Sequence, residues 1–142
     1  MRRIVTPVAF LALLPLAAAS AEQAYSPKTE VTQLLATSQT TVGQPIAYPA
    51  GTAHVTAAIV TVPPGAETGW HTHAVPLYGY MLAGTLTVDY GSKGTHVYKA
   101  GDSFMEAMNW PHNGVNKGHT PVRILAVYMG ATGIPNATPV AK

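Results

Sequence analysis

The chain of 142 residues contains no cysteine and few charged side chains. The absence of cysteine excludes a disulfide scaffold, a thiolate zinc site and a cysteine nucleophile. Charged residues make up only 10% of the sequence, which also holds 13 glycines and 12 prolines. This composition argues against a helical bundle or coiled coil, because such folds need charged helices rich in Ala and Leu. At about 150 residues per domain, the length predicts a single folded domain.

Residues 1–21 have the three regions of a secretory signal peptide. Two arginines follow Met1, an uncharged run extends from Ile4 to Ala19, and a small-x-small site ends at Ala21. The alternative is a membrane anchor, but the run contains two prolines and is shorter than the roughly 20 residues that a span needs. We therefore expect cleavage after Ala21 and a protein that is periplasmic or secreted.

Removal of this segment takes away Arg2 and Arg3, so Lys+Arg falls from 8 to 6 and equals the 6 acidic residues. The mature chain is then formally neutral and has no basic stripe. We therefore expect neither a nucleic-acid partner nor, after cleavage, a membrane partner. A small-molecule ligand or substrate is the expected partner, and the sequence leaves open whether two copies form a homodimer.

The rest of the chain shows short β-strand patterns separated by Gly/Pro turns and no convincing helical periodicity. Residues 22–51 are rich in Ser, Thr, Gln and Pro and predict an extended N-terminal arm. Residues 52–133 predict one all-β barrel domain, and residues 134–142 a flexible C-terminal tail. The strands are expected at 54–62, 80–90, 95–99, 103–106 and 122–129. The strand at 80–90 is taken as continuous, and the apolar strand at 122–129 as buried on both faces.

Histidines offer the clearest candidate chemistry. His71 and His73 are two residues apart, so on a strand both imidazoles project from one face, where they can reach a single metal ion. A lone His-x-His pair is weak support for a metal site. The spacing of the glycines around this pair, and a third histidine at His112, strengthen the interpretation.

Together these residues resemble the two motifs of the cupin family, small β-barrels of the jelly-roll (RmlC-like) type. The first motif, G-x5-H-x-H-x3-E-x6-G, falls on Gly65, His71, His73, Leu77 and Gly84. The second, G-x5-P-x-G-x2-H-x3-N, falls on Gly101, Ala107, Asn109, His112 and Asn116. The resemblance implies a single cupin jelly-roll β-barrel with His71, His73 and His112 as metal ligands.

The departures from the motifs matter for the site. The family's glutamate, usually the fourth ligand, is Leu77 here, and its proline and glycine are Ala107 and Asn109. Glu106 precedes His112 and, by strand alternation, shares a face with Phe104, a residue suited to a barrel interior. We hypothesise that Glu106 replaces the missing ligand or acts as a nearby acid/base, since a buried carboxylate is costly unless paired or metal-bound. The alternative is a solvated or lysine-paired Glu106 at the rim.

Three imidazoles, with or without a carboxylate, suit one divalent transition metal, and Fe, Mn, Ni, Cu and Zn stay open. The resemblance implies a metal-dependent enzyme on a small organic molecule, of the oxygenase (dioxygenase) type. A non-catalytic exported protein that binds a metal or small ligand is the alternative. Tyr80 is the best polar candidate beside the metal and, with Glu106, a tentative catalytic residue. Because the histidines must be deprotonated to bind, we expect metal loss below about pH 6.

Overall fold

The structure, a computed structural model, describes residues 26 and 28–141, so the expected signal peptide at 1–21 lies outside the described residues. The chain divides into two compact units, residues 1–32 and 33–142. Within the first unit, residues 28–32 form no helix or strand and are exposed. The second unit holds every strand described below.

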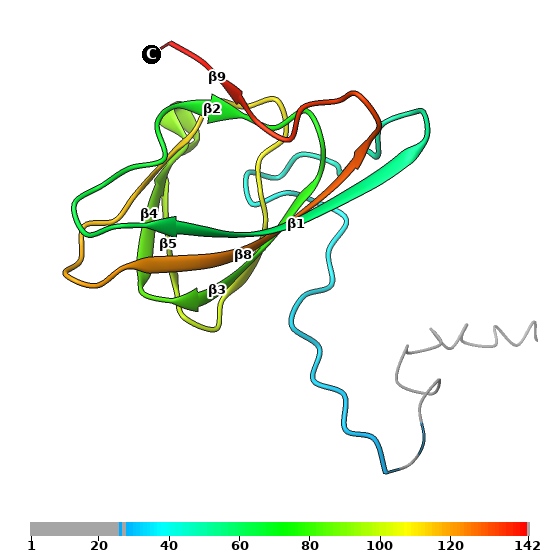
Figure 1. Ribbon diagram of the computed structural model, residues 1–142, viewed down its shortest axis with the longest axis horizontal. Coiled ribbons are helices and arrows are strands. Elements are labelled where there is room, and N and C mark those ends of the chain that lie inside the picture. The colour runs from blue at the N-terminus through cyan, green and yellow to red at the C-terminus, as the bar shows by residue number, and fades with distance from the viewer. Residues whose placement is uncertain (1–25, 27, 142) are drawn as a thin grey trace, which may run out of the picture. The chain divides into compact units, whose positions relative to one another are not determined.

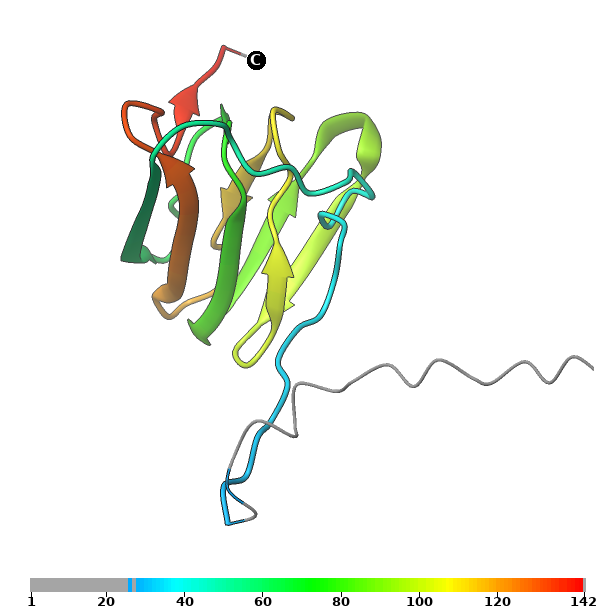
Figure 2. The same ribbon diagram turned by 90° about the vertical axis from the view of Figure 1, so that its right-hand side faces the viewer.

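The second unit is built from antiparallel β-strands (Figures 1 and 2). One sheet has the order β1-β8-β3-β6, formed by Ala53–Val62, Val122–Ala131, Leu77–Ala83 and Ser103–Met105. The second has the order β5-β4-β7, formed by Thr95–Lys99, Thr85–Asp89 and Asn113–Val115. A short pair joins β2 (His71–Thr72) to β9 (Thr138–Pro139). The predicted all-β jelly-roll barrel is confirmed.

Helical structure is almost absent from the described residues, which contain only one short 3-10 turn, η2 (Gly91–Lys93). This turn lies in the hairpin between β4 and β5, where the sequence predicts a turn. None of the helical structure described here is long and apolar enough to cross a bilayer.

The continuous strand expected at 80–90 is instead two strands that belong to different sheets. β3 ends at Ala83 and β4 begins at Thr85. Between them, Gly84 has a φ of +79°, and a Cβ there would lie 2.9 Å from the Pro121 carbonyl oxygen. Glycine is the residue that adopts this backbone at low cost. The break changes which residues face the interior. In β3 the odd-numbered residues are buried, whereas in β4 the even-numbered ones are.

The core fills the space between the two sheets. β8 contributes every second residue, from Val122 to Tyr128, and the opposite face of the same strand is half-exposed or exposed. The expectation that this strand is buried on both faces is therefore wrong. Phe104 lies against Gly79 on the neighbouring strand and stacks on Tyr98, with ring centroids 4.1 Å apart. Both aromatic rings belong to the hydrophobic core.

The two ends of the chain were expected to be an extended arm at 22–51 and a flexible tail at 134–142, and they differ. Residues 33–50 contain no extended strand, only an isolated bridge between Gln39 and Pro45 around a turn. Residues 134–141, expected to be a flexible tail, instead include β9, which pairs with β2. The Val140 amide also donates to the Trp70 carbonyl at 3.0 Å. The tail is therefore held against the strand that carries His71.

Candidate metal centre

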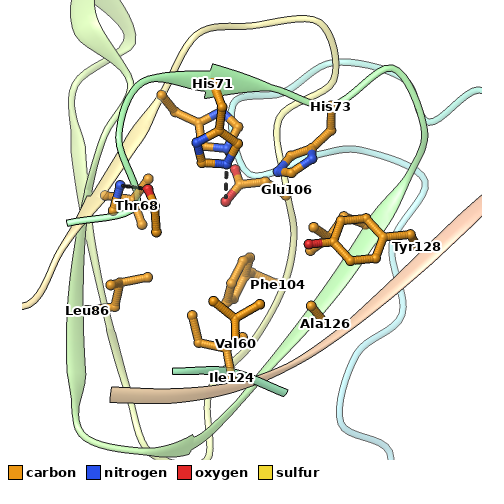
Figure 3. Close-up of a pocket in the computed structure, with 14 residues that line it drawn as sticks. Val60, Thr68, His71, His73, Leu86, Phe104, Glu106, Ile124, Ala126 and Tyr128 are labelled. Carbon is orange, nitrogen blue, oxygen red and sulfur yellow. Dashed lines mark hydrogen bonds and ion pairs between the residues drawn. The ribbon is translucent and has the colours of Figure 1, made fainter. Parts of the chain in front are cut away.

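The three predicted histidines come together at one end of the barrel interior. Their candidate ligand atoms all lie within 4.8 Å of one another. Two of the histidines are almost fully buried, His73 at 3% and His112 at 2% exposure, and His71 is half-buried. Figure 3 shows His71 and His73 above a cavity whose opposite wall is apolar.

Backbone pairing explains why these side chains converge. The amide of His71 donates to the carbonyl of His112 at 3.1 Å, and the amide of His112 donates back to His71 at 3.0 Å. The two histidines are therefore directly opposed in an isolated antiparallel bridge, with His112 immediately before β7. His73 follows the end of β2, and its carbonyl accepts from the Asn109 amide at 2.8 Å.

The motif's glycine position is occupied by Asn109, and the structure shows how the fold accommodates it. Asn109 has a φ of +50°, a left-handed conformation that glycine adopts freely. Asparagine tolerates this region better than most other residues. The departure from the motif therefore preserves the turn that brings the chain to His112.

Each histidine also has a hydrogen bond that determines its tautomer. The Nδ1 atoms of His71, His73 and His112 lie 2.8, 2.6 and 2.8 Å from the backbone carbonyls of Gly69, Asn136 and Trp110. A carbonyl oxygen only accepts, so in each case Nδ1 carries the hydrogen and donates it. The Nε2 atom of each neutral ring then presents a lone pair, which is the arrangement typical of metal-binding histidines.

Burial keeps these rings neutral. It lowers the pKa of His73 to about 4, although the hydrogen bond to Asn136 works in the opposite direction. Burial likewise lowers the pKa of His71 and of His112. Neutral imidazole is the form that binds metal. The site is therefore ready to coordinate a cation at neutral pH.

Glu106 lies inside the same cavity, and not at the rim. It is 5% exposed, and one carboxylate oxygen accepts from the Ala107 amide at 2.7 Å. Its backbone amide donates to the carbonyl of Leu77 at 2.9 Å, so it stands across the strand pair from the position where the motif has glutamate. The chain therefore holds a buried carboxylate close to the position where the motif has its glutamate. The solvated or lysine-paired alternative does not describe this residue.

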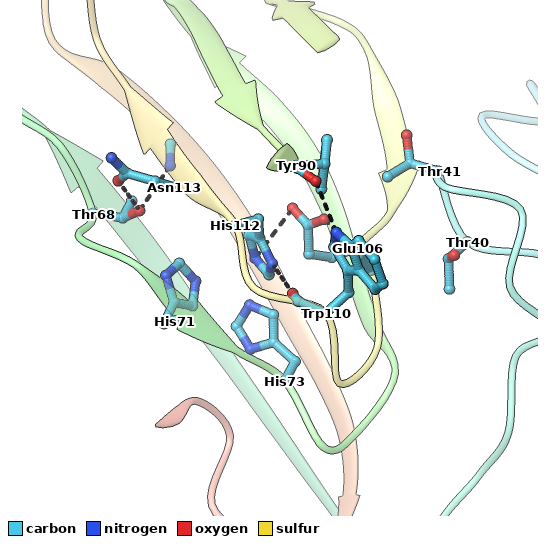
Figure 4. Close-up of polar contacts among 12 residues, drawn as sticks. Thr40, Thr41, Thr68, His71, His73, Tyr90, Glu106, Trp110, His112 and Asn113 are labelled. Carbon is cyan, nitrogen blue, oxygen red and sulfur yellow. Dashed lines mark hydrogen bonds and ion pairs between the residues drawn. The ribbon is translucent and has the colours of Figure 1, made fainter. Parts of the chain in front are cut away.

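The side chains of Glu106 and His112 lie close together but form no hydrogen bond with each other. Glu106 Oε2 lies 3.8 Å from His112 Nε2 (Figure 4). This distance is too long for a hydrogen bond. His112 Nε2 is also the one buried side-chain nitrogen or oxygen among the described residues that has no partner. A cation between these two atoms would satisfy the imidazole nitrogen, which otherwise has no partner in a buried site.

The donor set fits a divalent transition metal. Ligand atoms about 2.1 Å from one ion can be at most about 4.2 Å apart, so the widest pair must approach by roughly 0.6 Å on binding. Three imidazoles and one carboxylate suit Fe, Mn, Ni, Cu and Zn alike. Burial raises the pKa of Glu106, and the Tyr90 hydroxyl, which hydrogen-bonds to it, works against this rise. A bound cation would favour the carboxylate form.

Tyr80 is not brought to this cluster. It occupies the face of β3 opposite to Leu77, Gly79 and Met81, which are the buried residues of that strand. Tyr128 instead lies beside the imidazoles, its ring centroid 5.7 Å from that of His73. Its hydroxyl points into the cavity in Figure 3. Alternation along β8 was the signal that could have identified Tyr128.

Two further groups escaped the sequence analysis. Tyr90 is fully buried, and its ring centroid lies 5.6 Å from that of His112. The backbone carbonyl of Asn136 accepts a hydrogen bond from His73. Because every residue has such a carbonyl, the sequence does not identify this contact. Asn116 is structural, because its side-chain amide donates to the carbonyls of Val62 and Thr120.

Comparisons with known proteins agree with this geometry. The sequence matches the cupin domain family (Cupin_2) over residues 58–128. No protein of curated function was matched. Among solved structures, oxalate decarboxylase from Lactobacillus farciminis, in a formate complex, is 25% identical with a TM-score of 0.53. The match covers 61% of this chain and 26% of that one.

Two other structures show the same relationship. Bacillus subtilis oxalate decarboxylase at pH 4.6 is 25% identical with a TM-score of 0.52, over 61% of this chain and 23% of that one. An oxalate oxidase, 24% identical with a TM-score of 0.53, is matched over 61% of this chain and 46% of its own. The chain thus spans only about a quarter of the decarboxylases it resembles. The family match, the antiparallel barrel and the three convergent histidines together show that this chain belongs to the cupin family.

Proposed function

We propose that this cupin binds one divalent transition metal through His71, His73 and His112, with Glu106 as the fourth ligand, and acts as a metal-dependent enzyme on a small organic molecule. One observation carries the proposal. Three neutral imidazoles, each oriented by a backbone carbonyl, direct bare Nε2 atoms at one buried point, and one of these atoms has no other partner. Metal-binding histidines ordinarily donate a hydrogen bond of this kind from the ring nitrogen that does not bind the metal.

The reaction we propose is of the dioxygenase type. It adds both atoms of O2 to the substrate, which supplies the electrons, so no outside reductant is needed. When bound, the metal would hold and polarise an oxygen-bearing ligand. Among the described residues, Glu106 is the one carboxyl group that lines this mainly apolar cavity, in position to accept or return a proton if it is not coordinated.

Metal analysis of purified protein tests the site. We expect about one equivalent in the wild type and in His119→Ala, which removes an exposed histidine as a matched control. His112→Ala should lose nearly all of the metal, and Glu106→Gln should bind it more weakly. Unchanged metal content in His112→Ala would remove the site assignment. Unchanged affinity in Glu106→Gln would remove only the fourth ligand and leave Glu106 as an acid/base.

Oxygen consumption separates the enzyme from the second candidate, a non-catalytic metal- or ligand-binding cupin. The metal-loaded protein is offered small thiols and enols in an oxygen electrode. Uptake that depends on the substrate and disappears in His112→Ala supports the enzyme. A fully metal-loaded protein that consumes no oxygen across this panel supports the binding protein.

We also propose that the chain is exported and that the mature protein begins at Glu22. The support is the sequence of residues 1–21. N-terminal sequencing of protein recovered from outside the cytoplasm tests it, and an intact Met1 terminus would contradict it. The homodimer is a further prediction, supported by exposed apolar residues such as Val55 and Ile59 on β1. Light scattering measures the mass directly.

A further inference from the structure

The cavity beneath the imidazoles is lined by a few polar groups and a larger apolar wall. Its polar groups are the three histidines, Glu106, Tyr128 and Thr68. Thr68 is already committed, because its hydroxyl accepts from the Gly114 amide at 2.9 Å. The rest of the wall is aliphatic or aromatic, made by Val60, Leu77, Leu86, Val88, Phe104, Ile124 and Ala126. Apart from Tyr128, no polar group is free to meet a ligand on the side away from the histidines.

No lysine or arginine is among the described residues that line this cavity. The one basic residue on β8, Arg123, is exposed on the outer face. A second negative charge that is not itself bound to the metal would therefore lie against apolar side chains without a cationic partner. Burying an unpaired charge is expensive, so the wall selects against ligands that carry a charge away from the metal position.

The enclosed space is also small. Its volume is about 70 Å³. An apolar protein cavity of about 150 Å³ is known to hold benzene, so an aromatic ring does not fit within this one. The enclosed part of a ligand is limited to a few non-hydrogen atoms.

Tyr128 supplies the remaining element of recognition. Its hydroxyl forms no hydrogen bond within the described part of the chain, and it points into the cavity near the histidines (Figure 3). Burial raises the pKa of this phenol, so the group is a donor at neutral pH. A donor placed there meets a ligand oxygen that is held at the metal position.

From these observations we infer that the site takes a small ligand with a single oxygen-bearing head, bound at the metal and hydrogen-bonded by Tyr128, and a short apolar group packed against Phe104, Leu86 and Ile124. Ligands that carry a second carboxylate on the side away from the metal are selected against. The inference rests on the proposed metal site and specifies what that site selects.

Three carboxylates serve as probes in calorimetric titrations of the cobalt-loaded protein. Propionate should bind about fourfold more tightly than acetate, because one more CH2 group is buried. Malonate, which replaces the propionate methyl group with a second carboxylate, should bind at least about tenfold more weakly than propionate, since that charge has no partner. Malonate binding as tightly as propionate, or acetate binding as tightly as propionate, would overturn the inference.

Two variants assign the effect to the cavity. Tyr128→Phe should weaken acetate and propionate equally, by about five- to tenfold, without changing metal content. Tyr48→Phe, which alters an exposed tyrosine, is its matched control and should change neither. Ala126→Leu should remove the preference for propionate over acetate by filling the apolar end. Equal affinities in Tyr128→Phe and wild type would exclude Tyr128 from recognition.

Metal content is measured first, because it distinguishes failure of the proposed metal site from failure of the proposed ligand class. Protein that holds metal but prefers malonate overturns the ligand class and leaves the metal site standing. Protein that holds no metal overturns the proposed function, and this inference with it.

Discussion

The inner and outer faces of the same strands differ sharply in this barrel. On the inner face, Tyr128 and Glu106 lie against the imidazoles in a small, mainly apolar cavity. On the outer face of the adjacent strand, Tyr80 is half-exposed and contributes to no cavity wall near the histidines. One residue of displacement along a strand therefore decides between contact with the metal position and contact with solvent. Residue type alone does not distinguish the two tyrosines.

Acidification should have the largest effect, which is release of the metal from the inner face. We expect the protein to keep its metal at about pH 5 and to lose it only near pH 4, because burial lowers the pKa of His73 to about 4. Protons compete with the metal only where the imidazoles titrate. Release therefore falls at lower pH than the value of about 6 expected from unperturbed histidines. Dialysis at stepped pH followed by metal analysis measures it, and complete release by about pH 5.5 would contradict the buried site.

The same shifts predict how the stability of the metal-free protein depends on pH. Below the ordinary pKa of 6.5 the unfolded chain binds more protons at His73 than the folded chain, so stability falls as pH drops towards 4. Glu106 acts in the opposite sense, because burial raises its pKa above the ordinary value of 4.5. Above that pH the folded chain binds more protons at Glu106 than the unfolded chain, so this residue lowers the stability as pH rises and raises it on acidification. Melting temperatures of chelator-treated wild type and Glu106→Gln separate the two contributions. The variant should show the steeper fall on acidification.

Removal of the C-terminal tail tests whether a segment far away in the sequence is needed to orient the histidines on the inner face. A stop after Gly133 removes the Asn136 carbonyl that orients His73, as well as β9. We expect metal affinity to fall about 10- to 100-fold, the usual cost of losing such a hydrogen bond. A stop after Ala137 keeps the carbonyl but loses β9, and serves as the control. Equal affinities for the first truncation and wild type would show that the tail does not orient His73.

The ring of Phe104 packs in the core because Gly79, directly opposite it, has no side chain. A Cβ at Gly79 would overlap the ring of Phe104, which lies directly opposite in the sheet. Gly79→Ala should therefore destabilise the protein by about 1–3 kcal/mol, as overpacking does. Denaturant titration measures the change. Adding Phe104→Leu should recover part of the loss, whereas additive effects of the two changes would argue against the steric explanation.

How much of this could be read from the sequence differs from residue to residue. The histidines at 71, 73 and 112 follow from the resemblance to the two cupin motifs, the inward direction of Glu106 follows from strand alternation, and the structure brings all four together. Tyr80 was chosen because it lies next to the motif residues in the sequence, and the strand at 80–90 was taken as continuous. The turn at Gly84 reverses the parity, so Tyr80 does not share the face of Leu86 and Val88.

Long-range partners were beyond reach for a different reason. Asn136 acts through its backbone carbonyl, 63 residues away from His73, and no side-chain pattern marks such a contact. The unpartnered state of His112 Nε2 likewise depends on the packing of several strands at once. Motifs therefore locate the ligands, and the folded chain is needed to show what orients them.

The smallest effect should come from the outer face. Tyr80→Phe removes a hydroxyl from the side of β3 that does not line the cavity, so metal content, probe affinity and pH of release should equal those of wild type. Stability should change by less than about 0.5 kcal/mol, as for most surface substitutions. Tyr128→Phe makes the same chemical change on the inner face and should weaken probe binding. If Tyr80→Phe weakened acetate binding as much as Tyr128→Phe does, the two faces would be energetically coupled, and strand parity would not decide which tyrosine serves the site.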